Sequence, residues 1–228
     1  MNWSSGKDAA LAFHLLAQQP QFKVSHLLTT LSLDHERVFM HGVREELLDM
    51  QAQRMNLPIL KVKLPASLDD AIYKQAMLET MTSLQEQGVS VAAYGDIFLE
   101  DLKIYREQQL AQAGMTAIFP LWKKDTRELV HMVEANGIDA IIVCVSDRFL
   151  GKEFLGRKIN AALLNDLPAN VDPCGENGEF HSFVYNAPFF STPIPLTLGE
   201  VVHKTYTSPS GDSKWDTGFY FMDVMQSS

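Results

Sequence analysis

The sequence has few cysteines and no excess of positive charge. Among its 228 residues are two cysteines, Cys144 and Cys174, which are too few and too far apart for a disulfide framework or a cysteine-based metal site. Acidic residues outnumber basic ones, 28 to 19, and the formal net charge is −9 at pH 7. Because phosphate backbones are bound through clustered Lys and Arg, this balance argues against a nucleic-acid partner.

Long apolar runs and targeting segments are also missing. No run approaches the roughly 18 apolar residues that span a bilayer, and no signal peptide precedes the first loop. We therefore expect no membrane association and a cytoplasmic location. With 46% hydrophobic and 21% charged residues, the composition is typical of a globular chain, long enough for one large domain or two small ones.

Helical and strand periodicities alternate along the first half of the chain. This alternation predicts an α/β fold with a doubly wound, five-stranded parallel sheet, in which ligands bind at the carboxyl ends of the strands. The expected helices are 9–18, 43–55, 67–87 (with Ser67 as cap) and 100–113, and the expected buried strands are 24–33, 58–62, 89–94 and 117–120.

The second half is expected to form a smaller α/β domain, so that the domains are 1–120 and 121–228. Between its elements lies a loop, 167–179, whose length, prolines, glycines and carboxylates make it a candidate functional loop. The expected helices are 126–135 and 154–164, and the expected strands are 139–145, 180–185, 201–207 and 218–224.

The first loop, residues 3–9, has the composition of an anion-binding turn. Its small residues let the backbone approach an anion, the amides of the following helix carry partial positive charge, and Lys7 adds a cation. It is not a Walker A loop, because Asp8 and not Ser or Thr follows the lysine. From the residues alone, an ordinary helix N-cap with an incidental lysine is an equal alternative. Only Met1, Asn2 and Trp3 precede the small-residue turn that begins at Ser4, so the strand that should carry it is expected to be very short.

Several stretches, taken in order, resemble one family. The first loop looks like the S-G-G-x-D-S pyrophosphatase loop, or PP-loop, of the adenine-nucleotide alpha hydrolases, and the G-E-x-G-E-F-H segment at 175–181 is the specific part. The set is similar to the diphthine–ammonia ligase group and its bacterial relatives, and it covers nearly the whole chain. The matching stretches are Trp3–Ala9, His41–Val43, Tyr94–Ile97 with Glu100, Tyr105 and Arg106, Phe119–Trp122, and Asp172–Val184.

This resemblance implies a PP-loop ATPase-like fold and an ATP-dependent amide ligase. Members of the superfamily cleave ATP between its α and β phosphates, and a substrate carboxylate becomes an acyl-adenylate that ammonia converts to an amide, releasing AMP. ATP and Mg²⁺ are therefore the implied cofactors, with ammonia and a small-molecule or protein-borne carboxylate as partners, while a homodimer is left open. The family name implies diphthine, a modified histidine of translation elongation factor 2, as the carboxylate in archaea and eukaryotes.

The resemblance also implies roles for particular residues. Pyrophosphate needs amides and a cation, Mg²⁺ needs carboxylates, and the incoming ammonia needs acids and a base. Each of these residues also has a purely structural interpretation, and His41, Trp122 and Phe183 are interpreted as structural. The hypothesis requires the first loop and the 173–181 loop to face each other across a cleft. The assigned residues are Ser4, Ser5, Gly6 and Lys7 for pyrophosphate, Asp8 and Asp96, beside Gly95, for nucleotide and metal, and Lys7, Asp8, Glu176, Glu179 and His181 for catalysis.

Two positions depart from the family loop. Ser5 replaces its first glycine, which leaves the amide available provided that φ stays negative, and Ala9 replaces its final serine, which removes one phosphate donor. A degraded loop favours the alternative function, an ATP- or AMP-binding regulatory module without turnover. A tRNA thiolation or lysidine-type enzyme is a weaker third hypothesis, because it would require a cysteine pair or a basic surface.

Overall fold

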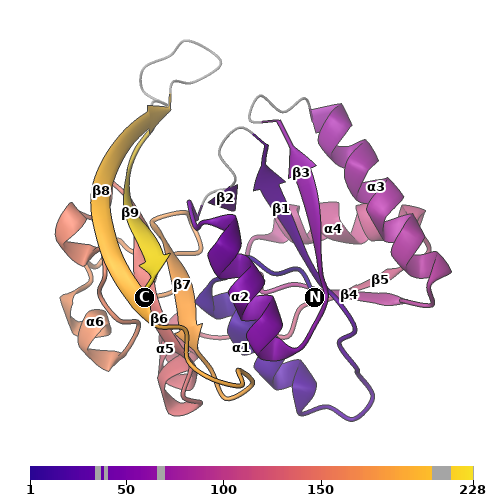
Figure 1. Ribbon diagram of the computed structural model, residues 1–228, viewed down its shortest axis with the longest axis horizontal. Helices are drawn as coiled ribbons and strands as arrows, with labels where there is room; N and C mark the ends of the chain where they lie inside the picture. The colour runs from indigo at the N-terminus through magenta and orange to yellow at the C-terminus, as the bar shows by residue number, and fades with distance from the viewer. Residues whose placement is uncertain (34–36, 39–40, 66–69, 207–216, 228) are drawn as a thin grey trace.

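The computed structural model describes residues 1–33, 37–38, 41–65, 70–206 and 217–227. Helices α1 and α2 lie between a parallel sheet and an antiparallel sheet (Figure 1). The expected cap at Ser67 lies outside the described residues. The first half contains α1 (Lys7–Ala17), β1 (Leu27–Ser32), β2 (Arg37–Val38), α2 (Glu45–Met55), β3 (Ile59–Leu64), α3 (Asp70–Glu86), β4 (Val91–Ala93), α4 (Glu100–Gln112) and β5 (Thr116–Ile118).

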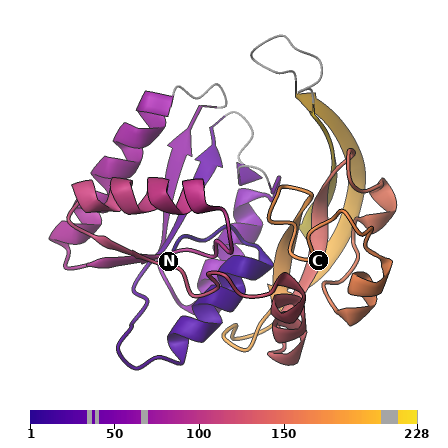
Figure 2. The same cartoon turned by 180° about the vertical axis from the view of Figure 1, so that it is seen from behind.

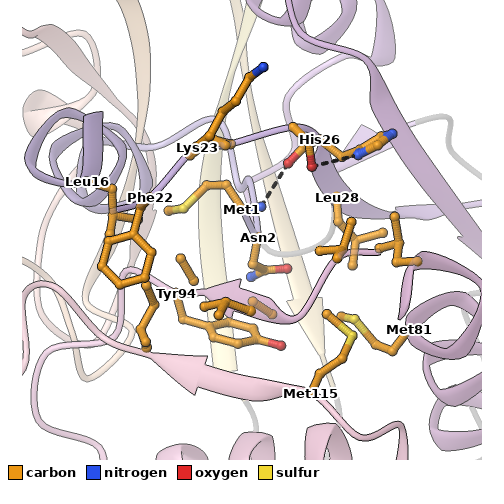
Figure 3. Close-up of a pocket in the computed structure, with 18 residues that line it drawn as sticks. Met1, Asn2, Leu16, Phe22, Lys23, His26, Leu28, Met81, Tyr94 and Met115 are labelled. Atoms are coloured by element: carbon orange, nitrogen blue, oxygen red, sulfur yellow. Dashed lines mark hydrogen bonds between the residues drawn. The ribbon is translucent and has the colours of Figure 1, made fainter. Parts of the chain in front are cut away.

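The parallel strands form two pieces that the first three residues connect. Strand β1 pairs with β3, and β4 pairs with β5, all in parallel, while β2 pairs antiparallel with the end of β1. Leu28 donates its N–H to the Met1 carbonyl (2.9 Å) and accepts from the Trp3 N–H (2.7 Å), while the Asn2 N–H bonds the Ala93 carbonyl (2.9 Å). Figure 3 shows Met1 and Asn2 between β1 and β4. The short segment therefore lies between the two sheets and links them. The alternating α/β architecture of the first half is confirmed, whereas the expected five-stranded parallel sheet is present as two sheets, of three and two strands, in the described residues.

Helices cover both faces of this parallel layer. Helices α3 and α4 lie on the outer face (Figure 2), over a small cluster of buried side chains from β1, β4 and these two helices. On the inner face, one larger cluster joins α1, α2 and β1 with elements of the second half. The two halves thus share a hydrophobic core, and the division at residue 120 stays a prediction.

The second half contains an antiparallel sheet of four strands in the order β7-β6-β9-β8, which the expectation of a smaller α/β domain did not specify. Strands β8 and β9 form a long curved pair at its outer side (Figure 1). No helix in the described part of the chain is long and apolar enough to cross a membrane. The elements are α5 (Thr126–Ala135), β6 (Asp139–Ser146), the 3₁₀ helix η1 (Lys152–Phe154), α6 (Ala161–Asp166), β7 (Phe180–Asn186), β8 (Leu196–Tyr206) and β9 (Thr217–Gln226).

The expected helix over 154–164 is wrong. Gly156 has φ +77°, which stops a right-handed helix, and the backbone then runs beside β6. Its N–H bonds the Ile142 carbonyl (2.8 Å), and the Ile159 N–H bonds the Ala140 carbonyl (2.9 Å). A helix begins only after Asn160, whose side-chain oxygen accepts from the Leu163 N–H (3.0 Å).

A buried glutamine on α2 ties the first loop to the second half. Gln51 has no exposed surface, and all its polar atoms are bonded. Its amide nitrogen donates to the carbonyls of Ser5 (3.1 Å) and Val184 (2.6 Å), and its oxygen accepts from the Trp3 indole N–H (2.8 Å). Because all three partner groups belong to buried residues, water cannot take the place of the glutamine side chain without a cost in stability.

We predict that Gln51→Ala lowers the free energy of unfolding by about 3 kcal/mol, because it removes three buried hydrogen bonds, leaves the Trp3 indole N–H without its acceptor and opens a cavity. Urea unfolding followed by circular dichroism measures this. Gln53→Ala, at an exposed position on the same helix, is the control and should change stability by less than about 0.5 kcal/mol. Equal effects of the two variants would contradict the prediction.

Candidate active site

One cavity of about 530 Å³ lies where the two halves meet. The first loop, the end of β4 and the loop before β7 all line it, so the two segments that the sequence hypothesis requires to face each other do so. A cavity of this size at the carboxyl ends of parallel strands is a usual place for a nucleotide. The expected site residues in its wall are Ser4, Lys7, Asp8, Gly95, Asp96, Glu176 and His181.

The first turn of α1 presents backbone amides to this cavity. The first bond inside the helix is from the Ala10 N–H to the Gly6 carbonyl (3.1 Å), so the amides of Asp8 and Ala9 have no acceptor within the helix. The Lys7 amide already donates to the Ser182 hydroxyl (3.1 Å). The helix N-terminus is therefore an anion site whose remaining donors come after the lysine.

Ser5 lies in the left-handed region of backbone conformation, which favours glycine. Its φ is +70°, so the condition of a negative φ, on which the availability of its amide was predicted to depend, is not met. The backbone turns here because the Ser5 carbonyl must meet the Val184 N–H (3.0 Å) and the Gln51 amide. A non-glycine residue in this region costs of order 1–3 kcal/mol. The Ser5 hydroxyl is also buried and without a hydrogen bond in the described part of the chain.

Gly95 allows β4 to approach the start of α1. A Cβ atom at this position would lie 2.8 Å from the Asp8 carbonyl carbon and 2.9 Å from the Ala9 nitrogen, so no larger residue fits. The neighbouring Asp96 carboxylate is held by Arg106, whose Nε lies 2.8 Å from Oδ2. The Arg106 guanidinium in turn stacks 4.2 Å from the centre of the Tyr94 ring.

Lys7 connects the two loops. Its side chain is only 2% exposed, and its ammonium donates to the Asp8 carboxylate (2.8 Å) and to the Cys174 carbonyl. Burial by itself would lower the pKa of Lys7, but the Asp8 charge and hydrogen bond, with smaller effects of Cys174 and Glu176, outweigh it and raise that pKa. Lys7 is therefore a charged group that already has partners on both sides of the cavity.

The two carboxylates expected to hold Mg²⁺ each have a cationic partner, Lys7 for Asp8 and Arg106 for Asp96, both at 2.8 Å. Within the described residues, no group of three or more His, Cys, Asp or Glu side chains is arranged to hold a metal ion. Carboxylate oxygens suit Mg²⁺, which usually binds through one or two of them together with substrate phosphates and water. A role for Mg²⁺ thus stays a prediction, in which the phosphates of the nucleotide and water supply most of the ligands of the ion.

The two glutamates of the second loop have different surroundings. Glu176 lines the cavity and accepts from the Ile97 N–H (2.7 Å), and burial raises its pKa to about 7. Glu179 is 1% exposed and accepts from the amides of Asp172 (2.9 Å) and Asn177 (3.0 Å), inside its own loop. Glu179 does not line the cavity, so the structure gives it the place of a loop-ordering residue and not that of an acid facing the substrate.

Two histidines meet in the cavity wall. The rings of His41 and His181 are 4.6 Å apart, and His41 Nδ1 lies 3.2 Å from the Ser182 carbonyl. Burial lowers the pKa of His41 to about 4 and that of His181 well below its usual value, with His41 and Lys7 as further causes for His181. His181 was expected in the site, whereas His41 was interpreted as structural. The only sequence signal for His41 was its position in the stretch His41–Val43, which matches the family.

Comparison with known sequences identifies relatives of both halves. Residues 1–117 match the family model "Diphthamide synthase N-terminal domain", and residues 125–227 match "Diphthamide synthase C-terminal domain". Proteins named diphthine–ammonia ligase are similar: that of Schizosaccharomyces pombe is 30% identical over 42% of this chain and 16% of its own length. That of Rattus norvegicus is 26% identical over 68% and 64%, and that of Danio rerio 24% over 70% and 69%. The match thus spans less than two thirds of the yeast and rat proteins.

We predict that Ser5→Gly raises the free energy of unfolding by about 1 kcal/mol, because the strain at φ +70° exceeds the entropy that glycine loses on folding. Thermal and urea unfolding measure this. Ser5→Ala removes the same buried hydroxyl but keeps the strain, so it should stabilise less. Equal gains in both variants would show that the hydroxyl, and not the backbone, is the cause.

We also predict that Glu176 makes stability depend on pH. Because its pKa rises from 4.5 in the unfolded chain to about 7 in the folded one, the folded state holds the proton more tightly. Its contribution is therefore present below pH 4.5 and is lost as pH rises through 7, by about 2 kcal/mol for a partly exposed group.

Urea unfolding at pH 5 and pH 8 compares the wild type with Glu176→Gln, which keeps an acceptor for the Ile97 N–H. The variant should lack the decline attributed to Glu176, while Glu86→Gln, at an exposed position, should retain it. A decline of equal size in Glu176→Gln would exclude Glu176 as its source.

Proposed function

Because this chain belongs to the diphthamide synthase family, we propose that it is an ATP-dependent amide ligase that adenylates a carboxylate and transfers it to ammonia. The observation that carries the proposal is the shared cavity: the anion-binding first turn of α1, the acidic loop before β7 and His181 near the start of β7 line the same space. An adenylating ligase needs both at one place, since the group that receives AMP must also meet the nitrogen nucleophile.

The first step of the proposed reaction is attack of the substrate carboxylate on the α-phosphorus. The charge that develops on the leaving pyrophosphate is held by Lys7 and by the amides of the first turn of α1, which have no acceptor within the helix. Gly95 lets the end of β4 approach the start of α1 closely, so that both segments can contact the same nucleotide. Asp8 and Asp96 are the carboxylates that would hold Mg²⁺, which supplies further positive charge to the phosphates when bound.

The second step is displacement of AMP by ammonia. Glu176, with its pKa raised to about 7, and His181, with an uncharged ring, are the groups that face this part of the cavity. Glu176 has a pKa near neutral pH, where a group can both accept and return a proton, and the uncharged His181 ring keeps one acceptor nitrogen. The carboxylate substrate is diphthine in the names of the related proteins, and for this chain diphthine is the first substrate to test.

A second candidate function, nucleotide binding without turnover, is favoured by one observation. Lys7 is occupied by Asp8 and the Cys174 carbonyl, and the family's serine hydroxyl is replaced by Ala9. A loop in this state offers fewer donors to pyrophosphate than the family loop does. The two functions differ in whether pyrophosphate is released.

We predict that the protein releases pyrophosphate and AMP from ATP when a substrate acid and ammonium are supplied, and that Ala9→Ser raises kcat/KM for ATP by about tenfold, because a hydroxyl bonded to a charged phosphate is restored. Ala161→Ser, in the first turn of α6 and outside the cavity, is the control. Diphthine-bearing elongation factor 2 and small carboxylic acids are the acids to assay. Clear ATP binding by calorimetry without pyrophosphate from any acid, in the wild type and in Ala9→Ser, would support the binding module instead.

A further inference from the structure

The turn that carries His41 is held from both halves of the molecule. On one side His41 contacts β7 through the Ser182 carbonyl, and its Cε1 lies 2.9 Å from where a Cβ on Gly6 would be. On the other side Gly42, with φ +67°, packs so closely on Phe221 of β9 that a Cβ would lie 2.7 Å from that ring. A surface turn with an incidental histidine does not require such contacts with two distant strands.

Asp223 on β9 fixes the same turn through a cluster of charges. Its carboxylate accepts from Arg37 Nη2 (3.0 Å) and, with both oxygens, from Arg44 Nε (2.9 Å) and Nη2 (2.6 Å). The second Nη of Arg37 donates to the Gly42 carbonyl (2.6 Å). The bidentate Arg44 pair gives the Asp223 carboxylate a defined orientation. From there Arg37 links Asp223 to the Gly42 carbonyl, next to His41 in the chain.

The hydrogen bond of His41 determines which nitrogen is free. A carbonyl oxygen only accepts, so Nδ1 carries the hydrogen toward Ser182 and Nε2 keeps a lone pair. The neighbouring His181 has a buried Nε2 without a hydrogen bond in the described part of the chain. Each uncharged imidazole keeps one acceptor nitrogen, which repels phosphate oxygens and attracts N–H donors. This property distinguishes the two histidines from the amides and the lysine of the anion-binding turn, beside which His41 lies.

We propose that His41 and His181 together accept the N–H groups of the nitrogen nucleophile, ammonia or a small primary amine, and that Asp223 is the positioning residue that holds His41 in place. The inference rests on the proposed function, and it places the amine within that site. Ammonia donates N–H groups to the two imidazoles and forms the C–N bond to the acyl carbon. The bond from that carbon to the AMP oxygen breaks with its electron pair on AMP, and the Glu176 carboxylate, which lines the same cavity, takes the proton that the nitrogen loses.

Steady-state kinetics with varied ammonium tests the roles of both residues. His41→Gln should lower kcat/KM for ammonium by about 10², with the Kd for ATP changed less than about twofold. Asp223→Asn should lower it by roughly tenfold. Asp139→Asn is the matched control, because Asp139 also bonds a cation, Lys158 at 2.6 Å, on the same sheet but outside the cavity. Equal losses in Asp223→Asn and Asp139→Asn would refute positioning by Asp223.

A binding measurement keeps this inference separate from turnover. With ¹⁵N-labelled histidine, the wild type should show His41 as the Nδ1–H tautomer, and ammonium chloride, but not sodium chloride, should shift the His41 and His181 signals. In Asp223→Asn the tautomer signal should broaden or move, while in Asp139→Asn it should not. Absence of an ammonium-specific shift in the wild type overturns the inference even if pyrophosphate is released. A shift without any pyrophosphate release leaves the amine site standing and removes the ligase.

Discussion

The site depends on the way the backbone of the first loop is bonded to β7. The Ser5 carbonyl accepts from the Val184 N–H, the Lys7 N–H donates to the Ser182 hydroxyl, and Gln51 bonds the carbonyls of both Ser5 and Val184. These groups are buried, and each one left unpaired costs about 1–3 kcal/mol. The two halves therefore cannot separate at this point without a large penalty, and the anion-binding turn stays beside the histidine-bearing strand.

The sequence predicted the first half well because each of its elements buries one face. Apolar periodicity distinguishes a helix that covers a sheet from a strand inside it, and α1, α2 and β1 lie where their periodicity placed them. The order of strands in the second half was not predictable in this way, since alternation alone does not distinguish parallel from antiparallel pairing in short strands. The missed break at Gly156 has a local cause: free backbone groups on β6 compete with helix formation, and periodicity does not report that competition.

The sequence indicated which segments line the cavity more accurately than it indicated which of their side chains point into it. The segment G-E-N-G-E contains two glutamates three residues apart, and only the turns at Gly175 (φ +71°) and Gly178 (φ +86°) decide that Glu176 reaches the cavity while Glu179 folds inward. A similar limit applies to His41 and Asp223. They are 182 positions apart, and nothing local in either stretch indicates that β9 lies under the turn that carries the histidine. Such contacts come from tertiary packing, which a single sequence expresses only through a family resemblance.

Charge pairing in the cavity constrains how a nucleotide enters the proposed site. Among the described residues of its wall, the basic groups Lys7 and Arg106 are each paired with a carboxylate, and the two histidines are uncharged. Lys7 can turn to a phosphate only if the Asp8 carboxylate finds another positive charge, because an unpaired buried carboxylate is costly. A divalent cation that arrives with the nucleotide supplies that charge when bound. In the proposed site, Asp8 serves two purposes at different times: it keeps the buried lysine charged before a nucleotide binds and releases it when the polyphosphate is present. Lys7 and Asp8 are adjacent in sequence at the start of α1, and their charged groups lie 2.8 Å apart. Lys7 can therefore exchange the Asp8 carboxylate for a phosphate by a change of side-chain conformation alone.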